Sequence, residues 1–187
     1  MRVNPLPPET LSPELKLVHE QIASLVGGSQ AQVVMLDDDG ALIGPFPPML
    51  HFPQFGLPAL TFLRSLDTQA TLDKKLREVA ILTVGGLFGA RFELYAHQIM
   101  AEVVGLEPDV ISSLSAGGRP LGLTPQETIA HDMATALVLG RIVQDSTYQQ
   151  ALQLLGREGA AELIFLISGY CLIAIVLNGF DISAPEK

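Results

Sequence analysis

Hydrophobic residues recur at a helical spacing along most of this chain. Near its start, Leu15, Val18 and Ile22 lie three or four residues apart, after a Ser12-Pro13-Glu14 sequence typical of a helix N-terminus. The pair Gly27-Gly28 is predicted to end this helix, because glycine favours the backbone conformation that closes helices. From residue 57 onward the same spacing continues with few interruptions. The pattern therefore predicts a mainly helical protein.

Between residues 32 and 58 the pattern is different. The apolar run Gln32–Leu36, the turn Asp37–Gly40 and a second run Ala41–Ile43 predict a small hairpin. The segment Gly44–Pro48 is predicted to be non-helical, because its prolines fix φ and lack N–H donors. Apolar side chains continue up to Pro58. This irregular arm is therefore expected to pack over a pocket mouth or a neighbouring subunit.

A series of helices is expected after this arm. Thr71 is the predicted N-cap of one of them, and Thr124 with Glu127 forms a capping box at the start of another. The predicted ranges are Ala59–Leu66, Leu72–Leu87, Phe92–Val104, Pro108–Ala116, Thr124–Leu139, Ser146–Leu155 and Gly159–Leu177. We therefore expect an all-α bundle, with an N-terminal helix and irregular arm over residues 1–56 and a helical domain over 57–187. The two parts are expected to form one structural unit.

Composition supports a folded domain that associates with copies of itself. The chain has 187 residues, of which 48% are apolar and 17% charged, so intrinsic disorder is excluded. The apolar fraction is high for a soluble monomer, and burial between identical subunits would account for it. We therefore expect a homo-oligomer.

Charge and segment length exclude several other classes. The net charge is −9 and the eleven Lys and Arg residues are dispersed, which disfavours binding to nucleic acid or to an anionic membrane surface. The apolar run Leu163–Leu177 is too short to span a bilayer and is expected to be a buried core or interface helix. Cys171 lies within it and is the only cysteine, so no internal disulfide can form. The sequence Met1–Pro8 does not resemble a signal peptide, so a cytoplasmic location is expected.

Glu93 and His97 form the first candidate for chemistry. They lie four residues apart, so a helix places both side chains on one face. A carboxylate beside an imidazole fixes the tautomer and raises the imidazole pKa, which suits a general acid or base near pH 7. Such pairs also occur on ordinary helix surfaces, and spacing alone does not separate the two cases.

Glu78 strengthens this candidate. It lies in a helix predicted to be buried on most sides, and its neighbour Arg77 points away from it, so Glu78 needs a partner on another helix. A glycine-rich segment, Gly85–Gly89, is expected to bring the two helices together. Glu78, Glu93 and His97 would then form a three-residue acid–base cluster. The competing interpretation is a solvated Glu78 on an exposed helix edge.

These residues resemble a known family. The sequence Arg77-Glu78, Phe92-Glu93-Leu94, Ala96-His97 and Gly105-Leu106 is similar to the core of the carboxymuconolactone decarboxylase and alkylhydroperoxidase-D superfamily. The similarity extends from Gly40 to Asn178 and includes Gly40–Phe46, Glu162-Leu163 and Gly169-Tyr170. The resemblance implies an alkylhydroperoxidase-D-like (AhpD-like) multi-helix bundle. It also implies a trimeric or hexameric assembly.

The redox chemistry of the alkylhydroperoxidase branch is not expected. In that branch a Cys-x-x-Cys pair follows the glutamate and precedes the histidine, whereas Ala90 and Glu93 occupy those two positions here. A thiol–disulfide cycle requires two thiols, and Cys171 lies in another helix without a partner. Glutamate at the second position resembles the decarboxylase branch instead.

The decarboxylase branch implies a cofactor-independent lyase or isomerase that acts on a small lactone or oxo-acid. His97 would carry the proton, Glu93 would orient it, and Glu78 would be a second acid or base, although the two glutamates could exchange roles. The substrate-binding candidates are Arg77, Arg91 and His51, because a cation should hold substrate carboxylates. No organic cofactor is expected.

Other interpretations remain open. Glu78, Glu93 and His97 could supply three metal ligands, although no metal is expected, and His19 and His131 are interpreted as surface histidines. The fold could also serve as a non-catalytic ligand-binding or assembly subunit. An enclosed cavity around the cluster would favour an enzyme. A cluster open to water, or one plugged by Phe88 and Phe92, would favour the non-catalytic role.

Overall fold

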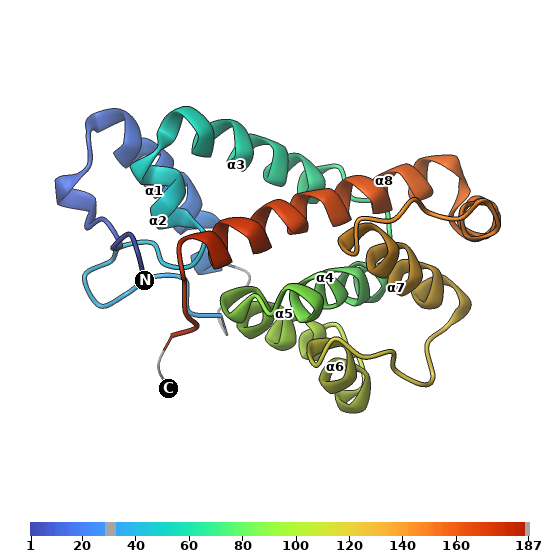
Figure 1. The fold of residues 1–187 in the computed structure, drawn as a ribbon. Coiled ribbons are helices and arrows are strands. Elements are labelled where there is room, and N and C mark those ends of the chain that lie inside the picture. Colours follow the sequence, from blue (N-terminus) through green and yellow to red (C-terminus); the bar gives the residue numbers. More distant parts are fainter. Residues whose placement is uncertain (29–32, 186–187) are drawn as a thin grey trace.

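The computed structural model describes residues 1–28 and 33–185 (Figure 1). These residues form one short 3₁₀ helix, η1, and eight α-helices, with no β-strand among them. The elements are η1 (Pro8–Thr10), α1 (Pro13–Gly28), α2 (Phe46–His51), α3 (Pro53–Thr68), α4 (Lys74–Phe88), α5 (Arg91–Val103), α6 (Pro108–Ser115), α7 (Pro125–Val138) and α8 (Asp145–Gly179). The predicted all-α class is confirmed.

The first helix forms as predicted but buries one histidine that was expected at the surface. α1 begins at Pro13, where the hydroxyl of Ser12 accepts a hydrogen bond from the backbone N–H of Leu15. His19 is buried, and its Nε2 atom lies 3.0 Å from the carbonyl oxygen of Gly40. The surface interpretation of His19 was therefore wrong, because α1 packs this face against the turn at residues 37–40.

The predicted hairpin is reduced to a tight turn with one antiparallel bridge, between Leu36 and Leu42. The carboxylate of Asp37 accepts hydrogen bonds from the backbone N–H groups of Asp39 and Ala41, which closes the turn. Too few backbone pairs follow to form a strand. Gln32, the first residue of the predicted hairpin, lies outside the described residues.

The arm after this turn is helical, contrary to prediction. α2 contains Pro47 and Pro48, and α3 starts at Pro53 and crosses the expected boundary at residue 57. Pro47, Pro48 and Pro53 are tolerated because they lie in first helical turns, where the N–H groups have no intrahelical partner, whereas Pro58 lies inside α3. A missing N–H donor weakens a helix only at positions where that N–H would bond within the helix, which the first turn does not require.

The helices after residue 70 agree with the predicted ranges to within a few residues. Asp73, not Thr71, caps α4 by accepting from the N–H of Lys75, and Thr71 instead donates to Glu162. The predicted capping box at the start of α7 is confirmed. α8 breaks at Gly156, with φ 72° and ψ 177°, between the two helices predicted there.

α8 lies between two groups of helices (Figure 1). On one side it contacts α3, and on the other it contacts α4, α5 and α7. α4 is the most enclosed of these helices, because α5, α6, α7 and α8 all pack against it. Residues on α4 therefore face neighbours in nearly every direction.

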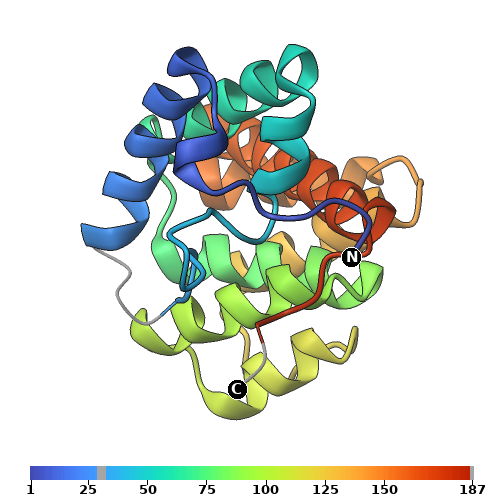
Figure 2. The same cartoon turned by 90° about the vertical axis from the view of Figure 1, so that its left-hand side faces the viewer.

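The N-terminus lies beside the segment that leaves α8, next to the start of α5 (Figure 2). The backbone N–H of Arg2 donates to the carbonyl oxygen of Phe180, and its side chain donates to Gly179. Asp181 then pairs with both the amino group of Met1 and the guanidinium of Arg91. These contacts fix the ends of the chain against the helical core.

α8 is the one helix in the described part of the chain that is long and apolar enough to cross a membrane, judged by length and composition alone. Its Gly156 break divides it, and its apolar part packs against α3, α4 and α7. Leu163, Leu166 and Ile167 are fully enclosed in that packing. These contacts are those of a core helix, as expected for Leu163–Leu177.

Candidate functional site

The turn between α4 and α5 positions the candidate side chains. Gly89 has a left-handed conformation, with φ 61°, and the N–H of Ala90 donates to the carbonyl oxygen of Gly85. This closure ends α4 and returns the chain as α5 along its side, as the glycine-rich sequence predicted. Glu78 on α4 and His97 on α5 meet across the resulting interface.

Glu78 and His97 form a buried hydrogen-bonded pair. The Nδ1 atom of His97 lies 2.9 Å from Oε2 of Glu78, and the two residues are only 8% and 5% exposed. Since a carboxylate can only accept, Nδ1–H must be the donor, which leaves Nε2 of the neutral ring as a proton acceptor. The interpretation of Glu78 as a solvated residue was therefore wrong.

Tyr170 of α8 completes one side of this pair. Its ring centroid lies 5.0 Å from that of His97, in an edge-on arrangement with an interplanar angle of 87°. Burial is the main cause that raises the pKa of the phenol, and the carboxylate of Glu78 raises it further. Tyr170 therefore stays protonated. We did not identify it as a site residue from the sequence, since helical spacing does not show what an aromatic ring faces in another helix.

Glu93 is a buried acid without a partner. It is 2% exposed, and within the described structure neither of its carboxyl oxygens has a hydrogen-bond partner. The carboxyl lies against the backbone of Gly85, where an added methyl group would sit 3.2 Å from Oε1.

The electrostatics of this position favour the uncharged acid. Burial raises the pKa of Glu93 well above its usual value of 4.5. Its place in the first turn of α5 favours the charged form, but that effect contributes only about 0.3–1 kcal/mol, against several kcal/mol for desolvation. The cost of desolvating the carboxylate therefore outweighs the favourable effect of the helix terminus.

The pairing inside the cluster differs from the first assignment made from the sequence. Glu93 was expected to orient His97 along one helix face, but His97 donates its hydrogen bond to Glu78. The physical reason is that α4 packs directly on α5 and delivers the Glu78 carboxylate to Nδ1. The alternative in which the two glutamates exchange roles fits this geometry better.

Arg77 takes part in an ion-pair network. Its guanidinium donates to the carbonyl oxygen of Leu66 at 2.9 Å and lies 3.3 Å from Glu162, with Asp67 at 3.7 Å. Burial acts to raise the pKa of Glu162, but hydrogen bonds from the Thr71 hydroxyl and from backbone N–H groups, together with Arg77, lower it overall. The network joins α3, α4 and α8.

Arg91, His51 and His131 also have partners elsewhere. Arg91 is exposed and donates to Asp181 at 2.7 Å, while His51 is exposed and lies 3.0 Å from the carbonyl oxygen of Asn4. Neither forms a hydrogen bond or ion pair with Glu78, Glu93 or His97 in the described structure. His131 is buried against α4 and α8 and lies 3.1 Å from Asp132, so its interpretation as a surface residue was wrong.

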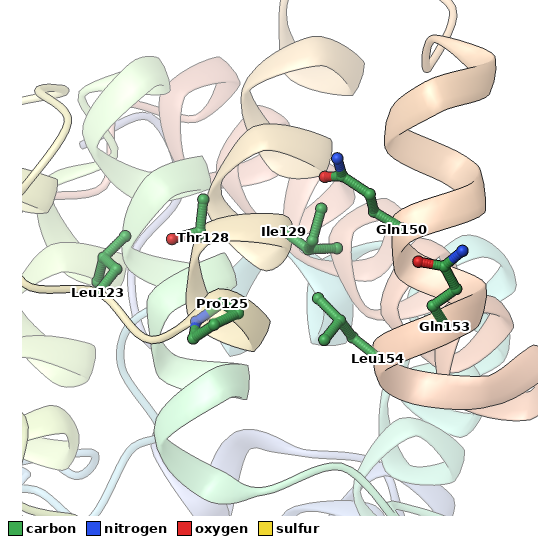
Figure 3. A pocket seen from close by; sticks show the side chains of 7 residues that line it. All are labelled: Leu123, Pro125, Thr128, Ile129, Gln150, Gln153 and Leu154. Carbon is green, nitrogen blue, oxygen red and sulfur yellow. The ribbon is translucent and has the colours of Figure 1, made fainter.

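Two hollows open at the surface of the described structure. One, of about 400 Å³, is open between α7 and the start of α8 and is lined by Leu123, Pro125, Thr128, Ile129, Gln150, Gln153 and Leu154 (Figure 3). The other, of about 540 Å³, is an apolar groove along α8 lined by Leu137, Ile164, Ile167, Ser168, Cys171, Leu172, Ile175 and Val176. Neither is lined by Glu78, Glu93 or His97.

The surroundings of the cluster match neither the enclosed cavity expected for an enzyme nor the open or plugged cluster expected for a non-catalytic subunit. Phe92 is buried in the core and Phe88 is half-buried. His97 retains a small exposed fraction of 8%, so the cluster is nearly closed rather than open to bulk water. Among the described residues, no three His, Cys, Asp or Glu side chains gather closely enough to hold a metal ion.

Comparison with known proteins establishes the fold. No protein-family model matches the chain, and no curated protein matches it significantly in sequence. A solved structure described as an alkylhydroperoxidase AhpD core, an uncharacterized peroxidase-related protein from Ralstonia eutropha JMP134, superposes with a TM-score of 0.78. The match covers 99% of this chain and 92% of that one, at 12% identity. The chain therefore has the AhpD-like all-α fold.

Proposed function

We propose that this protein is a cofactor-independent acid–base enzyme, a lyase or isomerase that acts on a small lactone or oxo compound. The observation that carries the proposal is the buried hydrogen bond between Glu78 and His97, with the unpartnered buried acid Glu93 one helical turn before His97 on α5. Two carboxyl groups in different electrostatic environments, one paired and one isolated, are a recurrent arrangement for acid–base catalysis. The AhpD-like fold is compatible with this activity but does not specify it.

In this proposal each residue has its own role. Nε2 of His97 accepts a proton from a substrate carbon, and Glu78 stabilises the imidazolium that forms. Glu93, held as the uncharged acid, donates a proton to the carbonyl oxygen on which negative charge develops. In a lyase, His97 in its charged form would instead return a proton to the carbon that loses CO₂.

Separate substitutions of Glu93 and His97 test this assignment. Glu93→Gln and His97→Ala are each expected to lower turnover of a responsive lactone or oxo compound by about 10²–10⁴-fold. Glu102→Gln is the matched control, because Glu102 is an exposed residue of the same helix. Undiminished turnover in both site variants would show that the cluster is not catalytic.

A non-catalytic subunit of the same fold is the second candidate. It is favoured by one observation: the two hollows described above do not reach the cluster, and His97 is only 8% exposed. In that case Glu78 and His97 would serve stability alone. His97→Ala would then unfold more easily than the parent protein, while the parent protein would turn over none of the lactones and oxo compounds tested.

Peroxide reduction through thiols is disfavoured. By the family resemblance, Ala90 and Glu93 occupy the positions of the two redox cysteines, and burial raises the pKa of Cys171 to about 11. A thiol with so high a pKa is a poor nucleophile at neutral pH. Peroxidase activity with a dithiol reductant that Cys171→Ser abolishes would contradict this exclusion of the thiol mechanism, whereas activity that persists in the variant would show that peroxide is reduced without a protein thiol.

We also propose that the apolar groove on α8 receives a second copy of this chain. No charged side chain lines the groove, so two subunits of net charge −9 can meet there without direct repulsion. Ile175 and Phe165 protrude from the same helix, at 59% and 58% exposure. A surface that offers both a groove and protruding side chains is suited to a symmetric contact with itself.

A further inference from the structure

The charges around the Glu78, Glu93 and His97 cluster suggest which substrates it accepts. Two of the three residues are carboxyl groups, and each is buried. A substrate carboxylate placed beside them would need a cation to offset the repulsion and the loss of water.

No unpaired buried cation lies beside the cluster in the described structure: the charge of Arg77 acts on Tyr170, but Arg77 already has carboxylate partners. Among the described Lys and Arg residues, Arg77 alone is not exposed, and Glu162 and Asp67 already pair with it. The remaining ones, Arg2, Lys16, Arg64, Lys74, Lys75, Arg91, Arg119, Arg141 and Arg157, are all exposed. Lys187 lies outside the described residues.

The donors that the cluster does offer are uncharged. Glu93 has no hydrogen-bond partner, and the Tyr170 ring stands edge-on to His97. An uncharged acid or phenol is matched to a neutral carbonyl oxygen, which gains negative charge only as the reaction proceeds.

We infer that the substrate is an uncharged carbonyl compound, such as an unsaturated lactone or ketone, and that the reaction is an isomerisation rather than a decarboxylation. This inference rests on the proposed acid–base function and narrows it. Decarboxylation requires a carboxylate on the substrate. This site would place two buried carboxyl groups beside that carboxylate, and among the described residues it has no unpaired cation to bind it.

The isomerisation balances without another reactant. His97 removes a proton from the carbon next to the carbonyl group, and the C–H electron pair moves into a new C=C bond. The carbonyl π electrons move to oxygen, which takes the proton of Glu93 to give a dienol. The dienol O–H then returns its proton to Glu93, while His97 delivers its proton to the carbon at the far end of the conjugated system. The double bond has moved, and both residues recover their starting states.

Three probes of one ring separate charge from shape. The first is a β,γ-unsaturated γ-butyrolactone, the second carries a carboxymethyl group on that ring, and the third is the methyl ester of the second. Proton NMR in deuterated water follows deuterium uptake at carbon and loss of CO₂. We expect uptake with the lactone and the ester, and at least about 10-fold less with the carboxylate. Rates with the neutral probes should also be insensitive to salt between about 0.05 and 0.5 M.

The outcomes distinguish the inference from the function on which it rests. Equal or faster reaction of the carboxylate, or its decarboxylation, would overturn the inference and leave acid–base catalysis intact if His97→Ala abolishes it. Absence of reaction with all three probes would overturn both. Uptake with the neutral probes that Glu93→Gln and His97→Ala lower, but Glu102→Gln does not, supports both.

Discussion

Nδ1 of His97 donates to Oε2 of Glu78 over 2.9 Å, and this bond joins α4 to α5 inside the core. In this protein the hydrogen bond has a structural and a chemical consequence. It satisfies two buried polar groups that would otherwise destabilise the fold, and it fixes which ring nitrogen carries the proton. The two consequences can be measured separately.

Loss of the Glu78 carboxylate should be costly. Glu78→Ala leaves the buried His97 ring without its acceptor, so we expect a fall in the free energy of unfolding of about 3 kcal/mol. Glu78→Gln keeps the volume and one hydrogen-bonding oxygen, and its loss should be smaller, although turnover should still fall because the imidazolium is no longer stabilised. Urea titrations followed by circular dichroism measure both values. Equal stability of Glu78→Ala and the parent would contradict the pairing.

Glu93 should make stability depend on pH in a particular direction. Its folded pKa is raised above the unfolded value of 4.5, so the folded state binds the proton more tightly. This contribution is complete below pH 4.5 and is lost as pH rises through the raised pKa, at most about 1.4 kcal/mol per pH unit. Glu93→Gln removes it. As pH rises from about 5 to 8, the free energy of unfolding of Glu93→Gln should therefore increase relative to that of the parent. A difference that does not change with pH would be inconsistent with a buried, unpartnered acid.

The ring of Tyr170 should matter more to folding than its hydroxyl does. Tyr170→Phe preserves the edge-on contact with His97, and we expect a change of about 1 kcal/mol or less in the free energy of unfolding. Tyr170→Ala leaves a cavity beside His97 and should cost about 3–5 kcal/mol. If Tyr170→Phe folds normally but loses turnover, the hydroxyl contributes to the chemistry, and unchanged turnover would limit Tyr170 to positioning His97.

Cys171 should react slowly with thiol reagents in the folded protein. With a pKa of about 11, roughly one thiol in ten thousand is ionised at pH 7, and the side chain is half-buried in the α8 groove. Ellman's reagent should label it far more slowly than the same residue in urea. Labelling at equal rates with and without urea would show that the thiol is activated, against the geometry described here.

A charge in the α8 groove should prevent self-association. Ile175→Glu places a carboxylate on the proposed contact face, so light scattering after size exclusion should show the oligomer of the parent replaced by monomer. Leu121→Glu is a suitable control, because Leu121 is an exposed apolar residue outside the groove. A monomeric parent protein, or an Ile175→Glu variant with the mass of the parent oligomer, would contradict this interface.

The sequence predicted the local features of this fold well. The capping box at Thr124, the glycine closure between α4 and α5 and the division of the last helix near Gly156 all depend on residues close together in the chain. Such features follow from backbone conformation and hydrogen bonding within a few residues. The helical arm was missed for a local reason too, since the position of Pro47 within its turn was not considered.

The partners inside the cluster could not be predicted in the same way. Spacing places Glu93 and His97 on one helix face, but it does not show that α4 brings Glu78 closer to the ring. Tyr170 and the pairing of Arg77 with Glu162 depend on how α8 packs, which helical periodicity does not encode. Glu78, Glu93 and His97 could be named from the sequence, whereas the bond between Glu78 and His97 and the lack of a partner for Glu93 required the structure.

The order of the helices has a consequence for folding kinetics. Glu78 and His97 are only 19 residues apart and belong to a helical hairpin, so their contact carries a small loop-closure entropy. Tyr170 comes from the last helix and can reach His97 only when α8 docks. We therefore expect mutations at Glu78 to slow folding, with the high kinetic φ-values typical of residues in a folding nucleus. Mutations at Tyr170 should mainly accelerate unfolding. The acid–base pair would then be assembled before the aromatic ring that covers it.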